Sequence, residues 1–188
     1  MARIREAHRS VLLVVDVQAG VVGSAWESPR VIRNIAQAVD RARAQGAPIV
    51  WIQHSDDEMP QGSAAWQWVP GLIPAPGETV LQKTFNSAFE ETGLEEVLAH
   101  LGASHIALAG AATNWCIRAT AHAALERGYD LTVVRDAHTT TTTTLDNGVV
   151  IEAESVVREF NIAMTWMSYP GRKNRTLRAE ELDFAAPP

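Results

Sequence analysis

Apolar residues along this chain gather in short runs that seldom alternate with polar positions. Five such runs stand out: VLLVVDV (11–17), PIVWIQ (48–53), HIALAGA (105–111), LTVVRDA (131–137) and IAMTW (162–166). Many of their residues are β-branched, and continuous apolar character is typical of strands that are covered on both faces. The pattern therefore predicts five largely buried strands.

Amphipathic stretches between these runs predict helices. Ser28 followed by Pro29 is a helix-start signal, and Gly46 is a typical residue just past a helix end. Apolar residues recur at helical spacing in the other stretches as well. The predicted helices cover residues 29–45, 93–101, 115–127 and 147–160.

The alternation of strands and helices indicates the fold class. Repeated strand–helix–strand units imply parallel strands with right-handed crossovers and helices on both faces of the sheet. We therefore expect a three-layer α/β/α fold with a mainly parallel, open sheet. The 188 residues suffice for a single domain with a full core. We place that core at about residues 10–170 and expect residues 171–188 to form a polar tail on the surface or against a neighbouring subunit.

Composition narrows the classes of function. A net charge of -6 and a pI near 5.5 argue against a nucleic-acid partner. The first ten residues, MARIREAHRS, lack the apolar stretch of a signal peptide, and no apolar run approaches the roughly 20 residues that span a bilayer. A single cysteine cannot form an internal disulfide. We expect a soluble, cytoplasmic protein without a membrane partner.

Two segments interrupt the regular pattern. Residues 54–82 contain prolines, glycines and two tryptophans, and loops of this length are usually functional, so we interpret the segment as the wall or lid of a pocket. Six threonines at 139–144 follow a predicted strand. They either form a polar loop that caps the next helix or present one or two hydroxyls to the pocket.

Three residues of chemical interest fall at or near the carboxyl ends of predicted strands, where open α/β sheets bind ligands. Asp16 lies near the end of the first run, Lys83 directly follows the long loop, and Cys116 follows the third run at a predicted helix start. Each has a plainer interpretation, as a turn cap, a solvated charge and a packed apolar residue, respectively. Their joint placement at one edge of the sheet favours a reactive site.

The three side chains suit nucleophilic catalysis. A thiolate attacks carbonyls, and we expect the helix start and the Lys83 ammonium to lower the pKa of Cys116 below its free value near 8.5. Asp16 can accept the thiol proton and return it to a leaving amine. The small residues Gly110, Ala111 and Ala112 allow backbone amides to approach a substrate oxygen, as in an oxyanion hole.

These residues lie in stretches that resemble a known family. VLLVVDVQ (11–18), QKTFNSAF (82–89) and LAGAATNWCIRATAHAALERGYDLTVVRDA (108–137) are similar to the isochorismatase-like cysteine hydrolases, which include nicotinamidases and carbamoylsarcosine amidases. The resemblance runs from about residue 10 to residue 170. It implies a catalytic triad of Asp16, Lys83 and Cys116. It also implies a cis peptide bond between Ala111 and Ala112, and an oxyanion hole formed by the amides of Ala112 and Cys116.

The sequence departs from the metal-dependent nicotinamidases of that family. Those enzymes carry an aspartate and two histidines shortly after the second strand. Here His54 is followed by Asp56 and Asp57, but no second histidine occurs before Lys83. We therefore expect no metal site and no cofactor, and a nicotinamidase activity is disfavoured. Cys116 favours amide cleavage, because family members that hydrolyse the vinyl ether of isochorismate can lack this cysteine.

The sequence thus predicts a cysteine-dependent hydrolase that cleaves a small, non-peptide amide through a thioester. Isochorismate hydrolysis and a catalytically silent binding or scaffold protein are the alternatives. Association into a homodimer or larger homo-oligomer is expected, as the resemblance implies. The candidate pocket residues, whose alternative role is packing in the core or at a subunit interface, are Gln18, Trp26, Phe85 and Trp115, with Trp66 and Trp68 nearby.

Overall fold

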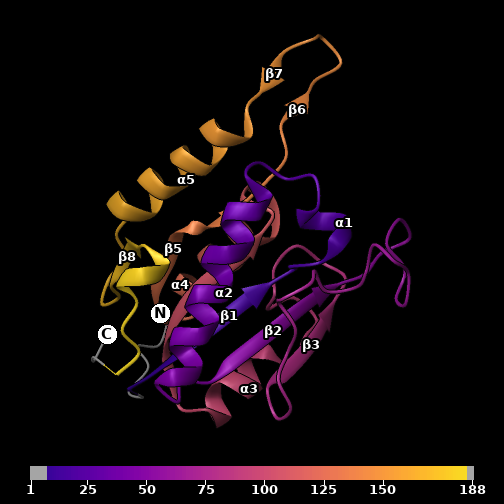
Figure 1. Ribbon diagram of the computed structural model, residues 1–188. Coiled ribbons are helices and arrows are strands. Elements are labelled where there is room, and N and C mark those ends of the chain that lie inside the picture. Colours follow the sequence, from indigo (N-terminus) through magenta and orange to yellow (C-terminus); the bar gives the residue numbers. More distant parts are fainter. Residues whose placement is uncertain (1–7, 186–188) are drawn as a thin grey trace.

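The computed structural model describes residues 8–185 and contains a six-stranded sheet (Figure 1). The strand order is β3-β2-β1-β4-β5-β8, and every neighbouring pair is parallel. The strands are β1 (Arg9–Val15), β2 (Ile49–His54), β3 (Thr79–Lys83), β4 (Ala103–Ala111), β5 (Asp130–Thr139) and β8 (Asn174–Leu177). The α-helices are α1 (Ala19–Val22), α2 (Ser28–Ala44), α3 (Leu94–His100), α4 (Arg118–Glu126) and α5 (Ala153–Trp166). The predicted α/β/α class with a parallel sheet is confirmed.

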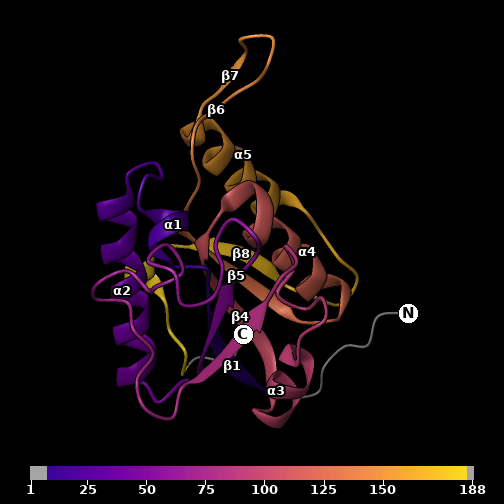
Figure 2. The same cartoon turned by 90° about the vertical axis from the view of Figure 1, so that its right-hand side faces the viewer.

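Helices cover both faces of this sheet (Figure 2). Side chains of α3, α4 and α5 form one apolar core with alternate residues of β1, such as Leu13. On the other face, α2 packs against the intervening residues of β1, such as Leu12 and Val14. Because successive side chains of a strand point to opposite faces, a strand between two cores needs apolar residues at every position. This explains the unbroken apolar run of β1.

The fifth predicted strand, residues 162–166, is wrong, because this run is the last turn of α5, and the helix predicted over residues 147–160 begins only at Ala153, after strand β7 (Val150–Ile151). Phe160 and Met164 lie one helical turn apart and are buried, whereas Ile162 and Trp166 face solvent. Exposed apolar residues between the buried ones imitated a continuous strand pattern. β3 was not predicted, because it is an edge strand of the sheet. Its side chains alternate between partly buried and exposed, so the sequence shows no unbroken apolar run there.

The C-terminal segment, predicted as a polar tail on the surface or against a neighbouring subunit, contributes to the sheet and to the core. Residues Asn174–Leu177 form β8, which pairs with β5 at the edge of the sheet. Ala179, in the 3₁₀ turn Ala179–Glu181, and Leu182 are buried against α2. The sequence did not predict β8, because an edge strand carries apolar side chains at few positions and this segment is mostly polar. Residues 1–7, which belong to the charged MARIREAHRS stretch, and residues 186–188 lie outside the described part of the chain.

A hairpin of β6 (Thr143–Thr144) and β7 (Val150–Ile151) stands away from the body of the protein (Figures 1 and 2). It exposes four large apolar side chains, those of Leu145, Val149, Val150 and Ile151.

Homo-oligomer formation stays a prediction. Among the described residues, no helix combines the length and apolar character needed to cross a membrane.

Gly110 allows two central strands to approach each other closely at the edge that carries the candidate site. Its φ is +128°, and a Cβ atom added there would lie 1.9 Å from the carbonyl oxygen of Val15. Val15 directly precedes Asp16, so Gly110 sets the path of β1 into the site. This contact explains why the position requires glycine, and the predicted approach to a substrate oxygen stays a prediction.

We expect Gly110→Ala to destabilise the fold by on the order of 3 kcal/mol, because it adds both a backbone clash and strain. Gly46→Ala is the matched control, since Gly46 also has a positive φ of +65° but nothing lies within 4 Å of its added Cβ. Urea unfolding measures both variants. Equal losses of stability in the two variants would contradict the proposed clash.

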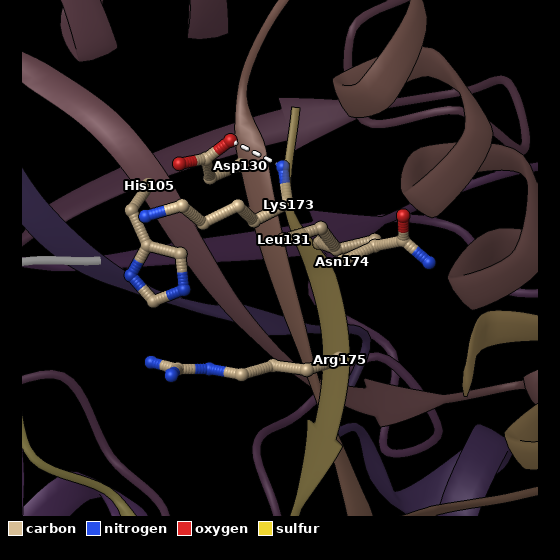
Figure 3. Close-up of a pocket in the computed structure, with 6 residues that line it drawn as sticks. All are labelled: His105, Asp130, Leu131, Lys173, Asn174 and Arg175. Carbon is tan, nitrogen blue, oxygen red and sulfur yellow. Dashed lines mark hydrogen bonds between the residues drawn. The ribbon is translucent and has the colours of Figure 1, made fainter. Parts of the chain in front are cut away.

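A small pocket of about 110 Å³ lies at the opposite edge of the sheet, at the amino ends of β4, β5 and β8 (Figure 3). His105 lines it and bonds two hydroxyls through its ring nitrogens, Ser10 Oγ at 2.9 Å and Thr132 Oγ1 at 2.8 Å. Burial lowers the pKa of His105 to about 4. His138, which bonds Thr113 and Asn161, has its pKa lowered to about 4 for the same reason.

These two histidines predict an acid-sensitive fold. The folded protein keeps both imidazoles neutral, whereas the unfolded chain takes up protons near pH 6.5. The contribution of the two neutral imidazoles to the free energy of unfolding is therefore fully present above pH 6.5. It is lost as the pH falls toward 4, by on the order of 3 kcal/mol for each histidine. Urea unfolding at pH 7, 5.5 and 4.5 tests this, and His105→Gln should weaken the dependence. His100→Gln is the control, because His100 is exposed, and it should leave the pH dependence of stability unchanged. An identical pH profile in both variants would show that His105 does not cause the dependence.

Candidate active site

Asp16 follows directly after β1 and turns back into the protein. Its φ of 52° places it in the left-handed region, which few residues other than glycine adopt, although aspartate is among the more tolerant. The side chain is 1% exposed. Residues held in this region often lie at functional sites, because surrounding structure must compensate the strain.

Lys83 is the last residue of β3, and its side chain reaches past β2 to Asp16. Its Nζ lies 2.7 Å from Asp16 Oδ2, and both side chains are buried. A buried charge is stable only when an opposite charge and hydrogen bonds compensate its lost hydration. The pair therefore joins two strands that are not neighbours in the sheet.

Cys116 completes the cluster from a third element. It lies in a π-helical turn, Thr113–Ile117, between β4 and α4, rather than at the start of an α-helix. The Lys83 ammonium donates a hydrogen bond to Cys116 Sγ over 3.3 Å. The structure thus brings together Asp16, Lys83 and Cys116, which the sequence separates by up to 100 residues.

The pKa of Cys116 differs from the expectation. Burial and, second, the Asp16 carboxylate raise the pKa of this thiol to about 12, although Lys83 acts in the opposite direction. The expected lowering is therefore wrong: the thiol is only 9% exposed, and the lost hydration of a thiolate outweighs the attraction of Lys83. Burial also raises the pKa of Asp16, against the opposing effect of Lys83. With a pKa of about 12 the thiol is protonated at neutral pH, and the Asp16 carboxyl lies next to it.

One oxygen of this carboxylate is uncommitted. Asp16 Oδ1 is buried and has no hydrogen-bond partner of standard geometry among residues 8–185, while the Cys116 thiol lies close enough to lower the pKa of the Asp16 carboxyl by hydrogen bonding. A buried acceptor without a partner is costly and calls for an explanation, of which a catalytic role is one. Oδ2 is held by Lys83, so Oδ1 is the oxygen that can receive a proton.

The predicted oxyanion hole lies at the end of β4. The peptide bond between Ala111 and Ala112 is cis, as the resemblance implies. The Ala112 carbonyl accepts hydrogen bonds from the amides of Trp115 and Ile117, at 3.1 Å each, which fixes the turn that carries Cys116. In the described part of the chain, no residue accepts a hydrogen bond from the Ala112 amide. That N–H is available to a substrate oxygen.

Gln18 holds the long loop rather than facing an open pocket. It is fully buried, its side-chain amide donates to the carbonyls of His54 and Trp66, and its oxygen accepts from the His54 amide. The loop therefore packs over the end of β2. Trp68 belongs to the core, where its ring lies 5.6 Å from that of Trp51.

The other predicted pocket aromatics lie nearer the surface. Phe85 is 46% exposed and Trp115, the neighbour of Cys116, is 60% exposed. The Trp26 amide donates to Thr140 and its carbonyl accepts from Thr139, so the threonine run is tied to this segment. These two partners of Trp26 are buried.

The threonine run also has the capping role that was considered. Thr142 Oγ1 accepts a hydrogen bond from the amide of Ala153, the first residue of α5. The hydroxyl of Thr140 donates to Asn114, two residues before Cys116. The run therefore both caps a helix and supports the turn of the candidate site.

His54 is a member of the cluster that reasoning from the sequence did not place there. Its Nδ1 lies 3.2 Å from Lys83 Nζ, and its Nε2 lies 2.9 Å from Asp56 Oδ2. Strand register explains the contact, because His54 and Lys83 are direct partners of β2 and β3. His54 and Asp56 also line a surface pocket of about 280 Å³ with Glu58 and Met59. A prediction of β3 from the sequence would have placed the two side chains together.

Comparisons with known proteins agree with this architecture. Residues 10–166 match the isochorismatase domain. Two streptothricin hydrolases of Streptomyces noursei are 36% identical over 137 residues, which is 69% of this chain and 54% or 49% of theirs. The chain thus spans about half the length of these curated relatives. A secreted isochorismatase effector of Verticillium dahliae is 30% identical over 135 residues, 68% of this chain and 71% of the effector.

Solved structures show the same fold. An isochorismatase from Pseudomonas putida superposes with a TM-score of 0.82 at 25% identity, over 97% of this chain and 93% of that one. A cysteine hydrolase from Pseudomonas syringae pv. phaseolicola, at 18% identity, reaches a TM-score of 0.81 over 92% of this chain and 90% of that one. The chain belongs to the isochorismatase family.

Metal independence stays a prediction. Within residues 8–185, no three His, Cys, Asp or Glu side chains are placed to hold a metal ion together. Both ring nitrogens of His54 are occupied by Lys83 and Asp56. We expect turnover of any substrate found by ammonia release to survive EDTA and dipicolinate. Chelator-sensitive turnover that zinc or iron restores would contradict this, with a zinc-dependent amidase as the control for the chelators.

Proposed function

We propose that this protein hydrolyses a small, non-peptide amide through a thioester on Cys116. The observation that carries the proposal is the contact cluster of Asp16, Lys83 and Cys116, with a carboxylate oxygen left uncommitted beside the thiol. A protonated thiol next to a base of raised pKa is suited to attack in which the proton leaves as the sulfur–carbon bond forms.

In the first half of the proposed reaction, Cys116 Sγ attacks the substrate carbonyl while its proton passes to Asp16. The carbonyl oxygen gains negative charge and accepts hydrogen bonds from the amides of Ala112 and Cys116. Asp16 then gives the proton to the departing nitrogen. The C–N bond breaks, ammonia or an amine leaves, and the acyl group stays on sulfur as a thioester.

In the second half, Asp16 takes a proton from a water molecule, whose oxygen attacks the thioester carbonyl. The same two amides hold the oxyanion, the C–S bond breaks, and the proton returns to the sulfur. Lys83 favours the charged form of Asp16, against the effect of burial, and stabilises negative charge on sulfur as the thiol loses its proton. The products are a carboxylic acid and the free enzyme.

Two other functions remain candidates. Hydrolysis of isochorismate is supported by the family and by the effector relative. A silent protein that binds without turnover would keep the fold and lose the chemistry. The decisive substrate test is a panel of small amides, ureides, nicotinamide, isochorismate and streptothricin, the last included because two relatives are named for its hydrolysis. Ammonia or amine release measures amide cleavage.

Cys116→Ala should fold normally and lose essentially all amidase turnover, because the chain contains no other thiol. The change removes one small, buried atom and little apolar area. In the wild type, acid quench followed by intact-mass measurement should show an acyl adduct that hydroxylamine traps as a hydroxamate. A folded Cys116→Ala protein that still hydrolyses the amide would overturn the proposal. Isochorismate turnover by that variant would favour the vinyl-ether alternative.

Asp16→Asn should lower kcat by about 10²- to 10⁴-fold, because it keeps the shape but removes the proton acceptor. Single-turnover measurements on the folded variant, checked by circular dichroism, separate this loss from unfolding. The exposed carboxylate of Asp57 provides a control, and Asp57→Asn should keep wild-type kcat. Near-normal turnover by Asp16→Asn would remove Asp16 from the mechanism.

A further inference from the structure

The Lys83 ammonium is surrounded by three acceptors. They are Asp16 Oδ2 at 2.7 Å, His54 Nδ1 at 3.2 Å and Cys116 Sγ at 3.3 Å. An ammonium group carries three N–H donors, so each donor has one partner. Two of these partners belong to the proposed chemistry, and the third, His54, does not.

The geometry fixes the tautomer of His54. Nδ1 can accept from Lys83 only if it carries no proton, so the proton of the neutral ring is on Nε2. Nε2 then donates to Asp56 Oδ2, 2.9 Å away. The other oxygen, Asp56 Oδ1, accepts from the amides of Glu58 and Met59 at 3.0 and 2.7 Å. These backbone hydrogen bonds lower the pKa of Asp56, with a further contribution from His54, and keep it ionised.

The backbone of His54 is held as firmly as its ring. Gln18 is fully buried and bonds both the amide and the carbonyl of His54, at 2.8 and 2.9 Å. The β2–β3 register places His54 directly beside Lys83. A continuous series of hydrogen bonds therefore runs from the 58–59 backbone through Asp56 and His54 to Lys83.

We propose that His54 and Asp56 form a positioning pair that aims the Lys83 ammonium at Asp16 and Cys116. The inference rests on the proposed function of these two residues and assigns His54 neither to substrate binding nor to a metal. Without the Nδ1 acceptor, one buried N–H of Lys83 has no partner, and the ammonium can turn away from the sulfur. Asp56 acts only through His54, because it holds the ring in the required tautomer.

The test measures the Cys116 thiol directly, so it needs no substrate. Iodoacetamide alkylation is followed by intact mass at pH 9, where only a small fraction of this thiol is ionised, so the rate reports how far its surroundings stabilise the thiolate. We expect His54→Ala to slow alkylation about tenfold, because an ammonium no longer held near the sulfur stabilises the thiolate less. His54→Asn should restore most of the rate, since its side-chain oxygen can occupy the position of Nδ1. An unchanged rate in His54→Ala would overturn the proposal, as would equal slowing in His54→Asn.

The role of Asp56 is tested by combining variants. Asp56→Ala should slow alkylation less than His54→Ala, and the double variant should match His54→Ala alone, because Asp56 acts through the histidine. Additive effects would overturn that dependence. Glu58→Gln is the matched control, because Glu58 lines the same pocket and has an exposed side chain; it should alkylate at the wild-type rate. Thermal unfolding checks that all variants are folded.

The outcome is separable from the proposed function. Normal alkylation in His54→Ala, together with turnover that depends on Cys116, would overturn this inference and leave the amidase proposal standing. Turnover that survives in Cys116→Ala would overturn the amidase proposal, whatever the alkylation rates. If His54 instead contacts substrate, KM rises in His54→Ala while alkylation is unchanged. If it positions Lys83, kcat falls and KM changes little.

Discussion

The buried ion pair between Lys83 and Asp16 is the interaction on which the site depends. Both side chains are almost completely removed from water, and their charged atoms lie 2.7 Å apart. Such a pair is stable only with good geometry and further hydrogen bonds, because each charge loses its hydration. Lys83 therefore requires acceptors around it, which Cys116 and His54 supply. The requirement to compensate one buried ammonium gathers the reactive groups at a single point.

Burial determines the resting state of this cluster. It raises the pKa of Cys116 to about 12 and also raises the pKa of Asp16. In the proposed mechanism, the thiol stays protonated until a substrate is in place and its proton can move to Asp16. A buried thiol that stays protonated is less exposed to oxidation or alkylation, because the thiolate is the reactive form. The same burial strengthens each charge interaction that acts during the reaction.

The parallel sheet places these side chains next to one another. β1, β3 and β4 end at one edge, so residues far apart in sequence meet there, as is usual for open α/β sheets. Close approach of β1 and β4 requires a residue without a Cβ at Gly110. His138 joins Thr113, in the turn that carries Cys116, to α5 through Asn161. The site is therefore supported by the core rather than by surface loops alone.

Local sequence alone determined the class of fold, four of the strands, and the three residues of the cluster. Unbroken apolar runs identify strands that are covered on both faces, and charged residues at their ends are visible exceptions. Sequence patterns did not reveal β3, β8 or the helical state of residues 162–166, since edge strands and exposed apolar positions lack a distinctive period. Only the tertiary structure placed His54 against Lys83 and reversed the expected direction of the Cys116 pKa. Both depend on strand register and on burial, and these arise from contacts between residues that are distant in the chain.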